Sequence, residues 1–236
     1  MLLWFLRWQR LRGHTFDQLP KGLAKQPLSA VPLLAVDLEL TSLDVANAQV
    51  LSVGWVEGSG SQIDLSSCNY QIIYSASDLQ QSPVIHGLTD EVVRRGDNIK
   101  TVIEMLKKYV GTHLFVLHNT QLDMSVLNRA ATSLGVYIPC VVTLDTLRLA
   151  VYHLKKQHEL VPPDSATLAA CRRRLQLPAA PAHNALDDAL ATLTLWFAQQ
   201  HIMDPKHQLC VKDLLHTGAL QLYSLGGRVT TANQMR

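Results

Sequence analysis

Short apolar runs alternate along the chain with segments that repeat apolar residues at helical spacing. Residues 31–36 and 113–117 are almost uninterrupted apolar runs, which is typical of strands covered on both faces of a sheet. Further strands are predicted over residues 48–56, 70–74 and 141–144. Helices are predicted over residues 98–110, 146–154 and 165–175, and two more contain Asp123 and Asp188 near their starts. This order of strands and crossover helices predicts an α/β sheet.

The pattern divides the chain into three parts. Residues 1–30 are a basic, Trp-containing N-terminal extension, residues 31–200 carry the alternating elements, and residues 201–236 are a C-terminal tail whose structure the pattern does not predict. In the extension, Trp4, Trp8 and Leu11 would share one helical face. We favour packing of this face on the protein's own surface; the alternative is a contact of residues 1–12 with an anionic membrane surface or a partner.

Two acidic residues stand at the end of the first predicted strand. Asp37 and Glu39 are two residues apart, and side chains at that spacing project from the same face of a strand. Two carboxylates held this close repel, and one would be driven to take up a proton unless a cation neutralises them. Hard oxygen ligands of this kind suit Mg²⁺ or Mn²⁺.

Further acids follow two other predicted elements. Asp123 comes after the apolar run 113–117 and the pair His118-Asn119, in the first turn of a predicted helix. His183 and Asp188 are five residues apart, which turns an α-helix through roughly 500°, so they could not share a helical face. Pro178 and Pro181 predict that His183 lies in a loop before the helix, from which it can converge with Asp188.

With these motifs in this order, the chain resembles the DEDDh 3′–5′ exonucleases of the DnaQ-like type, which include the DNA polymerase III epsilon proofreading subunit. Asp37 and Glu39 match the first motif, D-x-E; Asp123 after His118-Asn119 matches the second; His183 and Asp188 match the third, H-x₄-D. The stretch 84–92 is similar to the segment of the family that carries a His-Gly pair, and Asp145-Thr146 stands where the family has an Asp-Thr pair. The resemblance covers roughly residues 33–199.

The resemblance implies a ribonuclease H-like fold, with a five-stranded mixed sheet flanked by helices. It also implies two Mg²⁺ or Mn²⁺ ions, a pair that can activate water and stabilise the leaving oxygen in phosphodiester hydrolysis. Asp37, Glu39 and Asp188 would hold the first ion, and Asp123 would complete the second site with Asp37 between the two. His183 would be the general base, since histidine ordinarily titrates near neutral pH.

The same resemblance suggests which residues bind the substrate. Leu40, Thr41, His86 and Asn119 would contact the terminal nucleotide, and hydrolysis would release a 5′-mononucleotide from a 3′ end. The family commonly has Thr-Thr-Gly after its D-x-E motif, whereas this chain has Leu40-Thr41-Ser42. This difference bears on substrate preference more than on activity.

Composition limits the remaining function classes. A net charge of +2 and a charged fraction of 17% give no overall nucleic-acid footprint, so contacts with phosphates must be local. The four cysteines lack C-x-x-C spacing and are expected to be reduced thiols. No apolar run approaches the length that spans a bilayer, and the N-terminus lacks the layout of a secretory signal, so a cytoplasmic location is expected.

Three functions stay open at this point. We favour a 3′–5′ exonuclease acting on single-stranded 3′ ends, with DNA as the favoured substrate and a polymerase or repair protein as a possible type of partner, since the chain contains no polymerase domain. The alternatives are an oligoribonuclease-like or RNA-trimming exonuclease, and a non-catalytic accessory module that keeps the fold. Asp145 is interpreted as a helix cap, and His118 as either a substrate-pocket or a structural residue.

Overall fold

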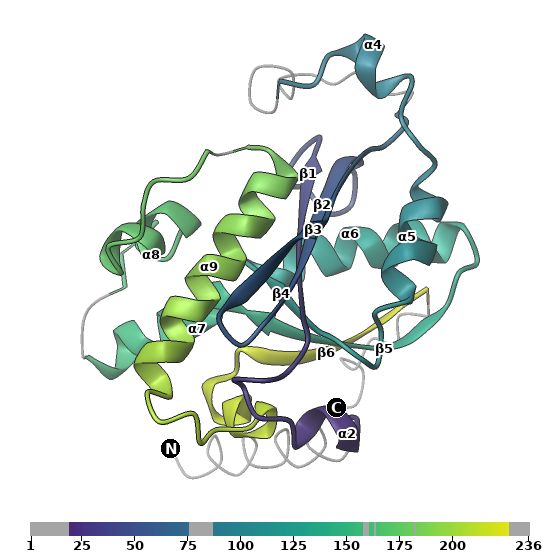
Figure 1. Cartoon of the computed structure of the whole chain (residues 1–236). Helices are drawn as coiled ribbons and strands as arrows, with labels where there is room; N and C mark the ends of the chain where they lie inside the picture. The colour runs from purple at the N-terminus through teal and green to yellow at the C-terminus, as the bar shows by residue number, and fades with distance from the viewer. Residues whose placement is uncertain (1–18, 76–86, 158–160, 163, 182, 227–236) are drawn as a thin grey trace, which may run out of the picture.

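The computed structural model describes residues 19–75, 87–157, 161–162, 164–181 and 183–226, which form a six-stranded sheet with helices on both faces (Figure 1). The strands are β1 Leu33–Leu40, β2 Val50–Ser59, β3 Gln62–Ile72, β4 Leu114–Leu117, β5 Ile138–Asp145 and β6 Leu220–Leu225, in the spatial order β3-β2-β1-β4-β5-β6. β1, β4 and β5 are parallel, and the other pairings are antiparallel. The predicted α/β class with a mixed sheet is confirmed.

The helices connect the strands and cover the sheet. They are α2 Lys21–Ala24, α4 Asp90–Val93, α5 Ile99–Lys107, α6 Thr120–Ser133, α7 Thr146–Lys156, α8 Leu168–Arg174, α9 Ala185–Met203 and the 3₁₀ helix η1 Val211–Thr217. Among the described residues, no helix is both long enough and apolar enough to cross a membrane. The predicted helical face at Trp4, Trp8 and Leu11 lies outside the described residues.

The prediction of five strands was wrong, because the C-terminal segment adds β6 to the sheet. β6 pairs antiparallel with β5, with Val142 opposite Leu222 and Leu144 opposite Leu220. Only the ends of β6, Leu220 and Leu225, are buried, so the strand has too little apolar periodicity to be recognised locally. Its position is decided by the exposed edge of β5, to which it supplies main-chain hydrogen bonds.

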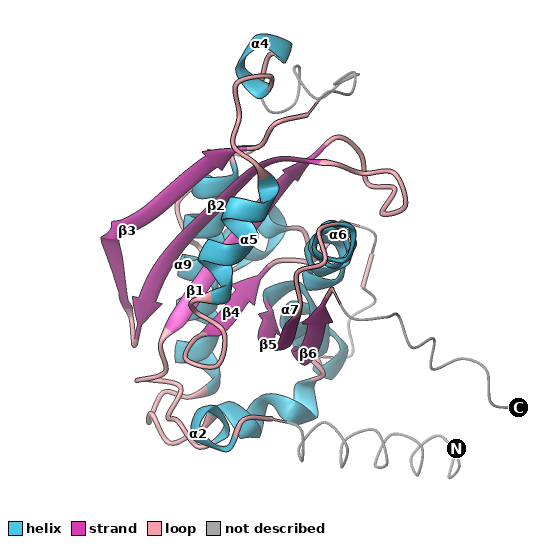
Figure 2. Cartoon of the chain, turned by 90° about the vertical axis from the view of Figure 1, so that its right-hand side faces the viewer, coloured by secondary structure: helices cyan, strands magenta, loops and turns pink. Residues whose placement is uncertain are grey.

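Helices cover both faces of the sheet (Figure 2), and an apolar layer holds them on each face. On one face, alternate β1 residues such as Leu34 and Val36 pack with α5 and α6. On the other face, Leu33 and Ala35 pack with α9, whose Leu193 and Trp196 are fully buried. Because β1 lies inside the sheet, its first four side chains, residues 33–36, are buried against helices on both faces, which explains the apolar sequence of that stretch.

Segments on both sides of the predicted central part pack against the same core. Leu23 and Leu28, which precede β1, lie in one apolar cluster with Val211 and Leu214 of η1. The backbone N–H of Leu28 also donates to the carbonyl oxygen of Leu209 at 2.9 Å. The described parts of the extension and the tail are therefore joined to the sheet domain.

Asp145 caps a helix, as the sequence analysis interpreted it, and it also holds a second helix. Its carboxylate accepts hydrogen bonds from the backbone N–H groups of Leu147 and Arg148 at the start of α7. It accepts two more from the N–H groups of Asn119 and Thr120 at the start of α6. The four donors stabilise this buried charge and fix the beginning of the helix that carries Asp123.

Candidate active site

Asp37 and Glu39 project from β1 toward α9. The strand continues through Leu40, so both acids lie within it, on the same face as Leu33 and Ala35, which pack with α9. Glu39 is buried and Asp37 is half-buried. The alternation of the strand thus delivers both carboxylates to one side of the sheet, where the N-terminal end of α9 lies.

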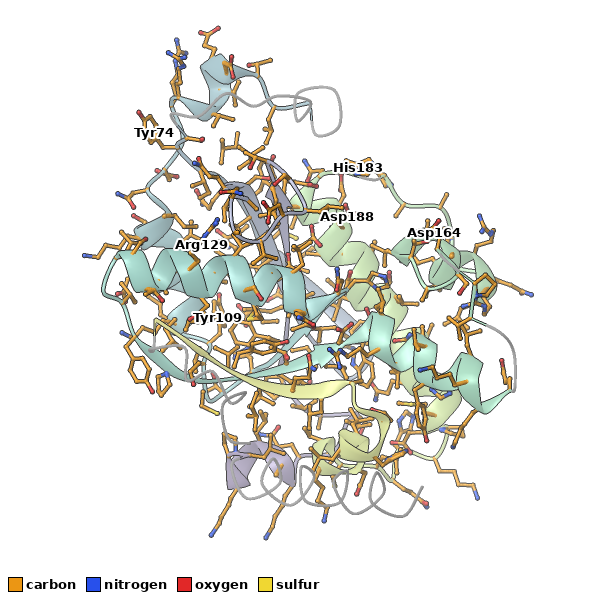
Figure 3. All side chains as sticks on the ribbon, turned by 180° about the vertical axis from the view of Figure 1, so that it is seen from behind. Tyr74, Tyr109, Arg129, Asp164, His183 and Asp188 are labelled. Atoms are coloured by element: carbon orange, nitrogen blue, oxygen red, sulfur yellow. The ribbon has the colours of Figure 1, made fainter. Side chains whose placement is uncertain are left out.

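His183 lies in a loop directly before α9, as the two prolines predicted. Asn184 caps this helix, because its side chain accepts hydrogen bonds from the N–H groups of Leu186 and Asp187. His183 has a positive φ of 66°, a conformation in which histidine is one of the enriched non-glycine residues. Its backbone N–H donates to Oδ2 of Asp188 at 3.0 Å, so the loop and the first helical turn are held together. Figure 3 labels both residues at this end of α9.

Three carboxylates converge where β1 meets α9. Oxygen atoms of Asp37, Glu39 and Asp188 all lie within 4.8 Å of one another. Residues that are 149 to 151 positions apart in the sequence therefore offer their ligand atoms to one point. Such a set of oxygen donors is suited to one divalent cation of the Mg²⁺ or Mn²⁺ type.

Burial raises the pKa of each acid in this group, and repulsion by the other acids raises it further for Asp37 and Glu39. Burial and then the charge of Asp188 raise the pKa of Glu39 to about 7. For Asp37, burial is again the largest cause, followed by the charges of Asp123, Asp188 and Glu39. Burial also raises the pKa of Asp188, although His183 acts in the opposite direction. A bound cation would favour the ionised forms and remove this repulsion.

Asp123 lies near these three acids but is not one of those whose oxygens converge within 4.8 Å. It is buried in the first turn of α6, and burial raises its pKa well above the usual range. Its charge acts on Asp37, and the charge of Glu39 acts on it, so all four acids share one electrostatic environment. The described residues nevertheless bring only Asp37, Glu39 and Asp188 within the reach of a single ion.

The predicted substrate-binding residues also serve the local fold. Leu40 is buried in the core. Thr41 forms two hydrogen bonds with Gln49 across the loop between β1 and β2. The N–H of Thr41 donates to the Gln49 carbonyl oxygen, and the N–H of Gln49 donates to Oγ1 of Thr41. Asn119 adopts a positive φ of 75° at the start of α6. His86 lies outside the described residues. The contacts of these residues with substrate stay predictions.

His118 has a structural role. Nδ1 lies 2.9 Å from Oγ1 of Thr146, and Nε2 lies 3.0 Å from the carbonyl oxygen of Ala166. Burial is the main reason that the pKa of His118 falls to about 4, so the ring is neutral at physiological pH. It joins the start of α7 to the segment before α8, and it also lines the cavity next to the acids.

A model of the exonuclease family RNase T matches residues 34–196, which is more than half of the chain. The chain belongs to the exonuclease family. The match begins within β1 and ends within α9, so it includes all three acidic motifs. It confirms the resemblance to DEDDh exonucleases on which the sequence analysis relied.

Relatives of the exonuclease family match parts of the chain. A protein of Mycobacterium tuberculosis described as a bifunctional exonuclease/endonuclease is 32% identical over 112 residues, which cover 48% of this chain and 17% of that protein. A PolC-type DNA polymerase III of Listeria welshimeri is 34% identical over 76 residues, which cover 31% of this chain and 5% of the polymerase. The matches thus span less than a fifth of either relative.

Solved structures of nucleases share the fold. Cell-death related nuclease 4 (CRN-4) superposes with a TM-score of 0.62 at 15% identity, covering 84% of this chain and 81% of that chain. The nuclease domain of 3′hExo, a DEDDh family member bound to rAMP, gives 0.57 at 17% identity, covering 77% and 96%. Escherichia coli Exonuclease I in complex with a dT13 oligonucleotide gives 0.59 at 15% identity, covering 75% and 42%.

Arg172 connects the loop of the third motif to the body of the exonuclease. Its buried guanidinium donates to the carbonyl oxygens of Ala191 at 2.7 Å and Pro178 at 2.8 Å, and it also bonds Thr194. These contacts tie the stretch that leads to His183 to α9. Arg172 is therefore a positioning residue.

The sequence analysis assigned no role to Gly54, although an isolated glycine within a strand is a known sign of close backbone approach. Gly54 lies opposite Asp37 in the β1–β2 register. A Cβ atom built on it would lie 2.2 Å from the backbone nitrogen of Leu186 and 2.3 Å from the carbonyl carbon of Ala185. The absence of a side chain lets α9 begin directly against the sheet, which brings Asp188 to Asp37.

Replacement of Gly54 by Ala is expected to push the start of α9 away from the sheet. The overlap is with rigid backbone, so we expect a loss of about 1–3 kcal/mol in the free energy of unfolding. We also expect weaker Mg²⁺ binding, because Asp188 moves with the helix. Urea unfolding and Mg²⁺ titration measure the two effects.

Gly22→Ala is the matched control. A Cβ at Gly22 would meet nothing within 4 Å, and alanine favours its helical conformation. The control should be neutral or slightly stabilising and should not change Mg²⁺ binding. Equal Mg²⁺ affinity in Gly54→Ala and wild type would contradict the role assigned to Gly54.

Proposed function

We propose that this exonuclease hydrolyses phosphodiester bonds at 3′-OH ends of single-stranded nucleic acid, with DNA favoured, and releases 5′-mononucleotides. The observation that carries the proposal is the convergence of Asp37, Glu39 and Asp188 next to a loop histidine, His183. A buried group of acids is costly for a pure binding module, because each charge must be desolvated beside others of the same sign. Such a group is useful when a cation and a phosphate meet there.

The donor set fits a divalent metal. Asp37, Glu39 and Asp188 would hold one ion, and Asp123 together with Asp37 would hold a second. Bound ions would neutralise the four acids, polarise the attacked phosphate and lower the pKa of the attacking water. The burial of these acids and the rise in their pKa values support this assignment, since they are the properties of a site that is incomplete without a cation.

His183 would accept the proton of the attacking water. The hydrogen bond from its backbone N–H to Asp188 keeps its loop next to the acids, while Asn184 starts the helix immediately after it. Attack forms a bond between water oxygen and phosphorus and breaks the bond to the 3′ oxygen of the preceding nucleotide. The leaving oxygen takes up a proton and becomes the new 3′-OH end.

The relatives support this choice of substrate. Exonuclease I with a bound dT13 oligonucleotide supports single-stranded DNA, and 3′hExo with bound rAMP keeps RNA as the alternative. The match to PolC-type polymerases supports a polymerase as partner, with a repair protein as the other candidate. A proofreading role would require such a partner.

We expect stepwise shortening of single-stranded DNA from a free 3′-OH end. A 5′-labelled oligonucleotide should give a ladder, and a 3′-labelled one should release labelled mononucleotide first. Single-stranded DNA, duplex DNA, RNA and dinucleotides compared with Mg²⁺ or Mn²⁺ would establish the substrate class. Moderate salt should change the rate little, because the site carries few cations.

Two substrates decide the direction of attack. A 3′-phosphate should block digestion, and a circular single strand should persist, because neither offers a free 3′-OH end. Rapid cutting of the circle would contradict an exonuclease. Activity confined to very short RNA would favour the oligoribonuclease-like alternative, and binding without cleavage would favour the accessory module.

A further inference from the structure

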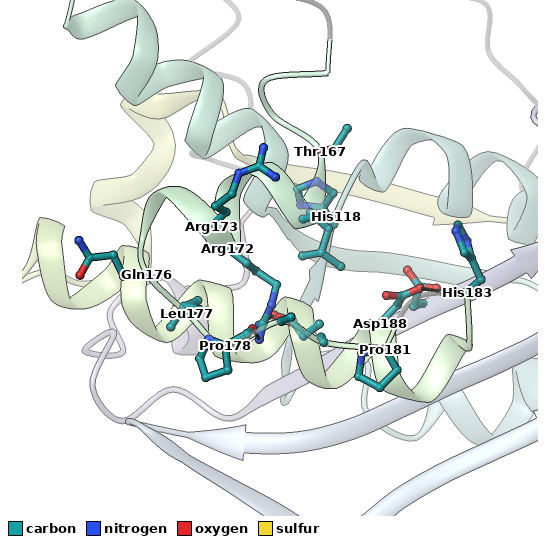
Figure 4. A pocket seen from close by; sticks show the side chains of 16 residues that line it. His118, Thr167, Arg172, Arg173, Gln176, Leu177, Pro178, Pro181, His183 and Asp188 are labelled. Atoms are coloured by element: carbon teal, nitrogen blue, oxygen red, sulfur yellow. Dashed lines mark hydrogen bonds between the residues drawn. The ribbon is translucent and has the colours of Figure 1, made fainter.

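A cavity of about 750 Å³ opens beside the acids (Figure 4). It is lined by Asp37, His183 and Asp188, by α8, and by the segment 176–181, which runs from the end of α8 toward the acids. Its size lies within the roughly 300–1,000 Å³ of typical small-molecule sites. A molecule in this cavity would be next to the reacting phosphate.

The wall of the cavity is mostly apolar. Its apolar lining residues include Leu168, Ala169, Leu177, Pro178 and Pro181. His118 also lines it, but both of its ring nitrogens are engaged, with Thr146 and Ala166. The wall can therefore contact the flat face of a base without selecting among bases.

Arg173 provides a cation at this cavity. Its neighbours in the sequence have structural bonds: Arg172 is buried against α9, and Arg174 donates to the carbonyl oxygen of Ser165 at 2.8 Å. Arg173 is exposed, lines the cavity, and has no ion pair with any described residue. Figure 4 shows it on α8, across the cavity from Asp188 and His183.

The cavity is separate from the region predicted for the terminal nucleotide. Leu40, Thr41 and Asn119 do not line it. A phosphodiester bond at the acids has one nucleotide on each side, so a terminal nucleotide near Thr41 leaves the second nucleotide to be placed elsewhere. The cavity is directly connected to the same acids.

We propose that this cavity binds the nucleotide immediately upstream of the attacked bond, with its base against the apolar wall and its 5′-phosphate at Arg173. This inference rests on the proposed exonuclease function. The upstream nucleotide carries the 3′ oxygen that leaves, so its binding orients the leaving group as well as the strand. An arginine is suited to the phosphate, and an apolar wall tolerates any base.

Two substrates separate this site from the catalytic acids. A single-stranded oligonucleotide has an upstream nucleotide, whereas the p-nitrophenyl ester of thymidine 5′-monophosphate has only a nitrophenol leaving group there. Arg173→Ala should raise KM for the oligonucleotide by about 5- to 20-fold. The slope of log KM against log salt concentration should fall by about one, which corresponds to one lost phosphate contact. The kcat/KM of this variant for the ester should stay within about twofold of wild type.

A second variant tests the apolar wall. Ala169 is exposed on α8 and lines the cavity, so Ala169→Trp should fill it with little effect on folding. We expect at least a roughly tenfold loss of kcat/KM for the oligonucleotide and little change for the ester. Arg95→Ala removes one exposed charge elsewhere and should change neither substrate.

A modified strand gives the same comparison without the ester. Wild type should cut an oligonucleotide with an abasic penultimate position about tenfold more slowly than the intact strand, and Ala169→Trp should not distinguish the two. Equal rates in wild type, or equal losses of both substrates in Arg173→Ala, would overturn the assignment of this cavity. If wild type cuts neither oligonucleotide nor ester, the proposed exonuclease function itself fails.

Discussion

Asp37→Ala and Asp188→Ala are each expected to lower kcat for digestion of single-stranded DNA by about 10³-fold or more. Each change removes one of the three carboxylates whose oxygens lie within 4.8 Å of one another, and a bound metal ion contributes several kcal/mol to transition-state stabilisation. Chelation by EDTA should have the same effect on wild type. Release of labelled mononucleotide at saturating Mg²⁺ measures the loss.

Asp187→Ala is the matched control for Asp188→Ala. Asp187 occupies the same first turn of α9 but is not one of the three converging acids. It should retain most of the wild-type activity. Full activity in Asp37→Ala or Asp188→Ala, with the fold intact, would contradict the assignment of these residues as metal ligands.

The same acids should make the metal-free protein more stable when one of them is neutralised. The folded-state pKa of Glu39 is about 7, above its ordinary value of 4.5, so ionised Glu39 lowers the free energy of unfolding. This destabilisation is absent below about pH 4.5, grows between pH 4.5 and 7, and is complete above pH 7. A shift of this size corresponds to about 3 kcal/mol. Glu39→Gln should therefore raise the free energy of unfolding by roughly 1–3 kcal/mol at pH 8 and by less at pH 5.

Urea unfolding with EDTA at the two pH values measures this effect. Added Mg²⁺ should make the wild type more stable than Glu39→Gln at pH 8, since it binds the wild type and stabilises it by mass action. Glu39→Gln should also lose most of its hydrolytic activity. A metal-free variant that is no more stable than wild type at pH 8 would contradict the repulsion that the structure indicates.

His183→Ala is expected to lower kcat by about 10²- to 10⁴-fold while Mg²⁺ and substrate still bind. The side chain is lost, but the backbone N–H that bonds Asp188 remains, so the ligand geometry should persist. The acid limb of the pH–rate profile should also flatten, because that limb would report protonation of the base. Single-turnover rates over pH 5–9 measure both effects.

Saturating Mg²⁺ is essential in this experiment. At subsaturating Mg²⁺, protonation of Glu39 near pH 7 would compete with metal binding and would produce an acid limb of its own. His201→Ala, an exposed residue near the end of α9, serves as the control and should match wild type. An unchanged rate and profile in a folded His183→Ala protein would show that the attacking water loses its proton without this histidine.

The sequence by itself determined the features that depend on local pattern. Alternation in a strand is enough to place Asp37 and Glu39 on one face, and two prolines are enough to keep His183 out of the helix that carries Asp188. Asp145 before a helical pattern is likewise enough to predict a cap, although not the second pair of N–H donors that it accepts from the start of α6. These features depend on neighbouring residues, which the sequence shows directly.

The tertiary structure decided what depends on approach through space. The packing of α9 on Gly54 brings Asp188 to Asp37. The open edge of β5 gives residues 220–225 a strand partner. The contacts of Arg172 and Arg174 distinguish these two residues from Arg173. Asp123 belongs to the second of the three sequence motifs, yet its position on α6 keeps it outside the group of Asp37, Glu39 and Asp188. Periodicity tells which face a residue occupies; how closely two faces approach is set by the side chains, or their absence, between them.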